Sequence, residues 1–222
     1  MKMFHSIALA STIILTSVGA IANDDKSGFA MGFGVGTTGL SGSATYKLSD
    51  HFNVRGVYAQ YNFSEQDTES GIDYDFDIEL NSLSLLLDYH PFATSGFRLS
   101  AGAVKNGTEF NATSTQTTGN INVGNSNFTA AQVGTLNANV SYDSFAPYLG
   151  IGWGNAVLKN RNLSFAIDIG VIGMDDPTIT LTSSGGNAAV NAELENERRE
   201  LETSLDDFAL YPVVNLSLNY QF

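Results

Sequence analysis

The sequence predicts an all-β fold, an eight-stranded antiparallel transmembrane β-barrel with a short helix in its last external loop. Three observations predict it: segments in which apolar residues alternate strictly with small or polar ones, connections that differ sharply in length, and no apolar run after the N-terminus long enough for a helical span. Successive side chains of a strand point to opposite faces, so strict alternation indicates strands with one apolar face. Strands can cross a membrane only as a closed barrel, because only closure bonds every backbone group.

The first residues have the pattern of a secretory signal. A basic start precedes an apolar run over residues 6–18, and the small residues Ala20 and Ala22 follow it. A membrane-spanning helix needs about 20 apolar residues, and this run is shorter. We therefore expect residues 1–22 to be a signal peptide and residues 23–222 to form an outer-membrane β-barrel in a Gram-negative bacterium.

Eight segments of the remaining chain fit the alternating pattern. They run over residues 29–36, 40–48, 52–63, 82–89, 97–103, 145–153, 163–171 and 214–222. In the third segment the facing is ambiguous, because either Val54 or Arg55 could point outward. The alternation changes phase near Asn81-Ser82 and near Asp143-Ser144. We expect β-bulges there, since one extra residue resets the facing; the alternative is that these strands continue above the membrane, free of any lipid constraint.

The connections between these segments differ in length and character. Three are short, one is a tight link at 37–39, and three are long and polar, near residues 64–77, 106–141 and 174–208. Outer-membrane barrels have short periplasmic turns and longer external loops, so both termini are expected on the periplasmic side. Within the last long stretch, apolar residues at helical spacing predict a short amphipathic helix that caps the barrel mouth or meets a partner: Val190, Leu194, Leu201 and Leu205.

Alternation alone leaves open which face is buried. A soluble lipocalin-like barrel would turn its apolar face inward. The polar faces here are rich in glycine, serine and alanine, which suits the narrow interior of eight strands and favours apolar residues on the outside. Aromatic residues also gather near the expected periplasmic rim, as in an interfacial girdle: Tyr46, Tyr89, Phe97, Trp153 and Tyr220.

The last strand ends on alternating apolar residues, Leu218, Tyr220 and Phe222. This ending resembles the C-terminal assembly signal that the barrel assembly machinery recognises in bacterial outer-membrane proteins. Residues 48–52 resemble the strand–turn–strand of OmpA/OmpW-type barrels, and residues 35–39 and 146–152 resemble segments of CarO-like eight-stranded barrels. The resemblance implies assembly in the outer membrane, with lipid, lipopolysaccharide and the assembly machinery as partners. It implies passage of small solutes only loosely.

Four charged residues are expected to face the lumen: Lys47, Asp88, Arg98 and Asp168. Asp88 and Arg98 lie symmetrically about the turn centred on Ala93, so they should face each other across a hairpin. Charges at membrane depth are often functional, which would make this cluster a gate or a cation relay. A narrow lumen favours the other interpretation, a plug in which the charges pair with one another.

The chain carries a net charge of −13, which argues against nucleic acid as a partner. Acidic residues concentrate in the second and fourth external loops, so small cationic solutes are the expected class if any solute passes. Asp73, Asp75, Asp77 and Glu79 alternate onto one face and form a candidate external cation site. The glycine of an EF-hand loop is absent, so a solvated acidic loop is the preferred interpretation.

The sequence offers little for catalysis. It has no cysteine, and after the expected cleavage its only histidines are His51 and His90, both at expected periplasmic turns. Serine catalysis needs a histidine and a carboxylate beside the nucleophile, and no such set appears. We expect no enzyme and no cofactor. The first hypothesis is an outer-membrane barrel with a structural or narrow-passage role; the alternative is an adhesion or ligand-binding protein that acts through its long external loops.

Overall fold

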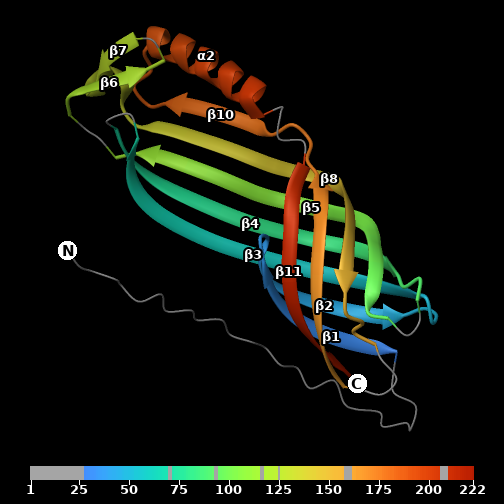
Figure 1. Cartoon of the computed structure of the whole chain (residues 1–222). Coiled ribbons are helices and arrows are strands. Elements are labelled where there is room, and N and C mark those ends of the chain that lie inside the picture. Colours follow the sequence, from blue (N-terminus) through green and yellow to red (C-terminus); the bar gives the residue numbers. More distant parts are fainter. Residues whose placement is uncertain are drawn as a thin grey trace, which may run out of the picture.

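Eight strands of the computed structural model close into a ring, which confirms the predicted barrel (Figure 1). The structure describes residues 28–69, 72–92, 95–115, 118–124, 126–157, 162–205 and 210–222, so the expected signal peptide lies outside it. The barrel strands are β1 (Phe29–Gly36), β2 (Gly39–Lys47), β3 (Phe52–Glu69), β4 (Ile72–Tyr89), β5 (Phe97–Ser114), β8 (Leu136–Trp153), β9 (Leu163–Gly173) and β11 (Leu210–Gln221). Every pairing is antiparallel, and the β1–β11 and β8–β9 pairings complete the ring.

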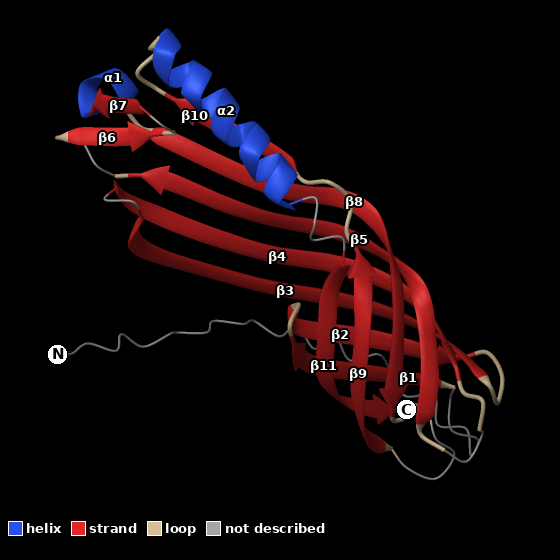
Figure 2. Ribbon diagram, turned by 45° about the horizontal axis from the view of Figure 1, so that its top comes forward, coloured by secondary structure: helices blue, strands red, loops and turns tan. Residues whose placement is uncertain are grey.

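The barrel strands fall into two groups, four of 18 residues and four of 8 to 12 residues. β3, β4, β5 and β8 have 18 residues each, whereas β1 has 8 and β2 has 9. At about 3.3 Å per residue, the long strands reach roughly 60 Å and β1 roughly 26 Å. A membrane-spanning strand needs only about 9–11 residues, so the four long strands continue well beyond the barrel as an open sheet on one side (Figure 2). β10 (Thr178–Ser183) pairs with the far part of β8 and adds a ninth strand to this sheet.

The far end of the open sheet carries a small folded unit. It consists of the hairpin β6 (Asn120–Val123) and β7 (Ser126–Thr129), the short α1 (Ala130–Val133), β10, and α2 (Ala188–Leu205); we call these elements the head. The head has its own apolar core, in which Ile121, Val133 and Val190 are fully buried. The stretches predicted as long polar loops are therefore mostly regular structure: β3 and β4 continue through residues 64–69 and 72–77, and apolar residues of the other two stretches meet in this core.

The predicted helix is present as α2, which includes all four of the apolar residues that predicted it. Val190 and Leu194 enter the core of the head, while Leu201 and Leu205, further along α2, lie over a cavity near the barrel mouth. Arg198 donates to Glu195 across 2.8 Å and also pairs with Glu202, which links successive turns. Among the described residues, no helix is both long and apolar enough to span a membrane.

The two predicted bulges are absent. The β3–β4 register is continuous from Phe52–Tyr89 to Glu69–Ile72, and the β5–β8 register is continuous from residues 97 and 153 to residues 113 and 137. The change of phase near Asn81 and near Ser144 has another cause, which the sequence left as the alternative. Beyond the barrel the long strands turn apolar residues toward the inner face, where the head packs; Tyr74 contacts the core of the head in this way.

The barrel is apolar outside and polar inside. Phe33, Leu85 and Phe165 on its outer face are 61, 64 and 77% exposed, whereas polar and charged side chains are buried within. An apolar belt of this extent is stable only against an apolar solvent such as lipid. Four of the five predicted girdle aromatics, Tyr46, Tyr89, Trp153 and Tyr220, are exposed around the end where Phe29 and Phe222 meet, and Phe97 beside them is partly buried.

Candidate functional site in the barrel lumen

Four charged side chains from four strands meet inside the barrel: Arg55 of β3, Asp88 of β4, Arg98 of β5 and Asp168 of β9, each less than 10% exposed. The guanidinium of Arg55 lies between the two carboxylates. Its Nε and Nη2 donate to Asp88 at 2.8 and 3.0 Å, and its Nη1 and Nη2 donate to Asp168 at 3.1 and 3.2 Å. Such two-pronged pairing suits the planar guanidinium and fixes its orientation.

Arg98 completes the network from the side of β5. Its Nη2 donates to Oδ1 of Asp168 at 2.6 Å, its Nη1 donates to the Gly154 carbonyl, and its Nε lies 3.9 Å from Oδ1 of Asp88. The Ser100 hydroxyl donates to the same Asp88 oxygen at 2.5 Å. Two arginines and two aspartates make the network neutral, and their mutual hydrogen bonds offset the cost of removing them from water.

A glycine makes room for the network on β8. Gly152 pairs with Arg98 on one side and with Asp168 on the other, so it separates these two residues in the sheet. A Cβ atom at Gly152 would lie 2.9 Å from both Nε of Arg98 and Oδ1 of Asp168. The absence of a side chain therefore lets the arginine reach across β8 to its aspartate.

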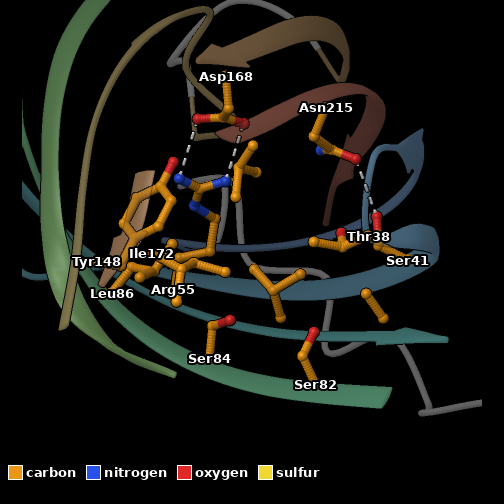
Figure 3. A pocket seen from close by; sticks show the side chains of 13 residues that line it. Thr38, Ser41, Arg55, Ser82, Ser84, Leu86, Tyr148, Asp168, Ile172 and Asn215 are labelled. Carbon is orange, nitrogen blue, oxygen red and sulfur yellow. Dashed lines mark hydrogen bonds and ion pairs between the residues drawn. The ribbon is translucent and has the colours of Figure 1, made fainter. Parts of the chain in front are cut away.

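The network divides the lumen into two small spaces. On the side toward the head, a cavity of about 40 Å³ lies between Arg55 and the polar residues Ser41, Ser84 and Asn215 (Figure 3). On the side toward the termini, only about 10 Å³ remains, next to Asn53 and His90 among others. One water needs about 10–15 Å³, so these spaces hold a few waters at most.

The structure brings together three of the four residues predicted for the lumen, Asp88, Arg98 and Asp168. Lys47 is not among them. It lies at the end of β2, where its Nζ contacts Asp50 at 2.7 Å and a quarter of its side chain is exposed. A local turn supplies its counter-charge, so Lys47 stays at the rim.

Arg55, which bonds both aspartates, is the residue that the sequence left undecided, because the facing of its strand was ambiguous. Asn53 and Ala59 stand at odd positions of β3, like Arg55, and both are buried. A polar and a small residue at those positions are the sequence signal that could have placed Arg55 on the inner face. The hairpin register also differs from the expected one: Ser100, rather than Arg98, lies opposite Asp88.

The acidic residues of the candidate cation site lie along the upper part of β4, where neighbours on β3 engage them. Asp77 accepts a hydrogen bond from Ser64 at 2.5 Å, and Asp75 accepts one from Gln66 at 2.6 Å. Across the part of the chain that the structure describes, no three acidic or histidine side chains are grouped so that they could hold a metal ion. The residues of the expected assembly signal, Leu218, Tyr220 and Phe222, lie on the outer face at the end of the chain and are 40–47% exposed.

Two solved structures of outer-membrane proteins are similar to this fold. CarO2 of Acinetobacter baumannii has 21% sequence identity and a TM-score of 0.59, over 89% of this chain and 99% of that chain. CarO of Acinetobacter baumannii has 25% identity and a TM-score of 0.58, over 88% of this chain and 98% of that chain. No protein-family model matches the sequence, and no curated protein sequence matches it. This similarity, together with a barrel that is apolar outside and polar inside, supports an outer-membrane β-barrel protein with a CarO-like fold.

Proposed function

We propose that this protein is a structural outer-membrane barrel whose lumen is closed at rest and which holds the head outside the outer leaflet. The observation that carries the proposal is the neutral network of Arg55, Arg98, Asp88 and Asp168, which leaves cavities of only about 40 and 10 Å³ on its two sides. Residues 1–22 would act as the signal peptide of such a protein in a Gram-negative bacterium.

The energetics of the network support a closed resting state. A solute that crosses the lumen must separate Arg55 from Asp88 or from Asp168, and breaking a buried ion pair by loss of one partner costs about 3–5 kcal/mol. Passage of a small solute would therefore require a rearrangement of the network. Acidic side chains on the outer surface of the open sheet beyond the barrel, such as Asp73 and Glu79, would favour cations among the solutes that approach it.

The histidines support a role without catalysis. The His51 ring contacts the His90 carbonyl at 2.7 Å through Nδ1, and buried His90 contacts the Asn53 amide at 3.1 Å through Nε2. Both rings thus have partners that hold the turn at the end of the barrel. A structural use of both histidines agrees with the absence of an enzymatic motif in the sequence.

Conductance in planar bilayers tests the proposal. We expect the purified protein to give no steady current. The charge-balanced double variant Arg55→Ala with Asp88→Ala should pass a measurable ionic current, because it opens space and leaves the Arg98–Asp168 pair neutral. The matched control, Lys47→Ala with Asp50→Ala, removes an exposed pair at the rim and should stay silent. A steady current through the unaltered protein would overturn the closed lumen.

A second candidate function is binding at the cell surface through the head. The observation that favours it is that the head is an ordered unit with a buried core, whereas a barrel needs no such unit to close its strands. Cells that carry the unaltered protein would then bind a surface or a matrix component. Cells that carry a variant with a glycine–serine linker in place of residues 118–133 would not bind. Equal binding by both kinds of cell would exclude this candidate.

A further inference from the structure

A second cavity lies outside the lumen, between α2 and the inner face of the open sheet. Its volume is about 500 Å³, within the range of about 300–1,000 Å³ that is typical of small-molecule sites. Its apolar walls come from α2, from the long strands and from the start of β11: Leu80, Phe110, Val140, Leu201, Leu205 and Pro212. Leu201 and Leu210 in its wall are 38 and 62% exposed, so the cavity opens to the outside.

One side of this cavity is polar but uncharged. Ser82, Asn106 and Thr108 line it, and Asn106 is 7% exposed. The Asn106 amide N–H donates to Sδ of Met174, a weak acceptor, at 3.6 Å, and its Oδ1 accepts the Thr108 backbone N–H at 3.2 Å, which leaves the second amide N–H available to a ligand. Among the described residues that line the cavity, none is an aspartate, glutamate, lysine or arginine. Burial also raises the pKa of the Tyr142 phenol in the wall, which keeps that group neutral.

The cavity borders the small lumen cavity beside Arg55, and Thr38, Ser82 and Ile172 line both. Leu86, Tyr148, Ile172 and Val213 are buried together between the cavity and the charge network. They form an apolar layer at the level where the barrel becomes the open sheet. A molecule in the cavity therefore rests on this layer and on the polar residues beside it.

We propose that this cavity is a binding site for a neutral amphiphile, a small molecule with a mainly apolar body and one uncharged hydrogen-bonding end. The apolar body lies against Phe110, Val140 and Leu201, and the polar end lies toward Asn106. A charged ligand is disfavoured, because the part of the lining that the structure describes offers no counter-charge and burial of an unpaired charge is costly. The inference rests on the head lying outside the lipid, but it is independent of whether the lumen conducts.

Binding of N-phenylnaphthylamine, a neutral aromatic fluorophore with one N–H donor, tests the site in the whole protein held in lipid nanodiscs. We expect saturable binding of one molecule per barrel above the signal of empty nanodiscs. Leu201→Asp places a carboxylate in the wall, and Val140→Trp fills the space. Each should weaken binding roughly tenfold or more, because the first adds an unpaired charge and the second removes volume.

Controls separate this result from general effects on the head. Thr203→Asp adds the same charge to the same part of α2 but lies outside the cavity wall, so it should bind the dye as the unaltered protein does. The anionic analogue anilinonaphthalene sulfonate should bind at least about tenfold more weakly than the neutral dye. Circular dichroism and heat-modifiable migration of each variant show whether it has folded.

Three results would overturn the proposal: no saturable binding above empty nanodiscs, equal affinity in the folded Leu201→Asp and Val140→Trp variants, or equal binding of the anionic dye. Conductance in planar bilayers tests the closed lumen separately from dye binding. A conducting protein that still binds the dye would refute the closed barrel and leave this site in place, whereas a silent barrel that does not bind would refute the site alone.

Discussion

The interaction between Arg55 and Asp88 should be measurable as a coupling energy. Arg55→Met keeps much of the side-chain volume but leaves the lumen with one uncompensated negative charge, and Asp88→Asn leaves one uncompensated positive charge. Each single change should cost about 3–5 kcal/mol of unfolding free energy, because it strands a buried partner. The double variant restores neutrality and keeps the Arg98–Asp168 contact of 2.6 Å. We therefore expect it to cost at least about 2 kcal/mol less than the sum of the single changes.

The chain supplies its own probe for this experiment. Trp153 is the only tryptophan, and it is 60% exposed on the outer face, so its fluorescence should report transfer from lipid to water when urea unfolds the barrel. Each protein would be folded into vesicles and titrated with urea under reversible conditions. The slopes of the four transitions must agree before their free energies are compared, because a changed slope means that a different amount of surface is exposed on unfolding.

A matched cycle on Lys47 and Asp50 serves as the control. This pair is at the rim, with the Asp50 side chain 68% exposed, so its coupling should be within about 1 kcal/mol of zero. Additive effects of Arg55→Met and Asp88→Asn would refute the reasoning, since additivity means that the two side chains do not compensate each other in the lumen. A double variant less stable than the sum would do so as well.

Two further perturbations follow from packing. Gly152→Ala should lower the free energy of unfolding by about 1–3 kcal/mol, because its Cβ would lie 2.9 Å from Arg98 and Asp168. Gly42→Ala, whose Cβ meets nothing within 4 Å, should lower it by less than about 1 kcal/mol. Urea titration measures both values, and equal losses would contradict the tight fit at Gly152. Val190→Ala should lower the free energy of unfolding of the head by about 2 kcal/mol, because Val190 is fully buried there. Proteolysis of α2 should then be faster, while the barrel stays heat-modifiable. An unchanged rate of proteolysis would argue against a cooperative core.

The sequence predicted the barrel well because alternation is a local signal that repeats in every strand. Asp88, Arg98 and Asp168 each stand among small or polar residues on a face opposite leucine or isoleucine, so their inward facing follows from the pattern. Arg55 was undecided because Val54 and Arg55 competed for the outer face within a mixed segment. Its bonds to Asp168 join residues 113 positions apart, and no local pattern contains a pairing of that kind.

The errors arose where the chain leaves the membrane. The change of phase near Asn81 looked like a bulge under the assumption that one solvent surrounds the whole strand. Beyond the barrel that assumption fails, because the head covers the inner face and makes apolar residues favourable there. Helical spacing found α2, but the partners of Val190 in β6 and α1 are distant in sequence, so the head could not be assembled from the pattern. Lys47 was misplaced because Asp50, three residues away, satisfies it at the rim.

The most direct test concerns the two faces of the barrel wall. Tyr148 and Leu149 are consecutive on β8, and they are 5 and 63% exposed because they point to opposite faces. After Trp153→Phe, a single tryptophan would be placed at one position or the other, and its fluorescence measured in vesicles of lipid brominated on the acyl chains. We expect strong quenching for Leu149→Trp and little for Tyr148→Trp. Quenching of the tryptophan at 148, with none at 149, would contradict a barrel that is apolar outside and polar within.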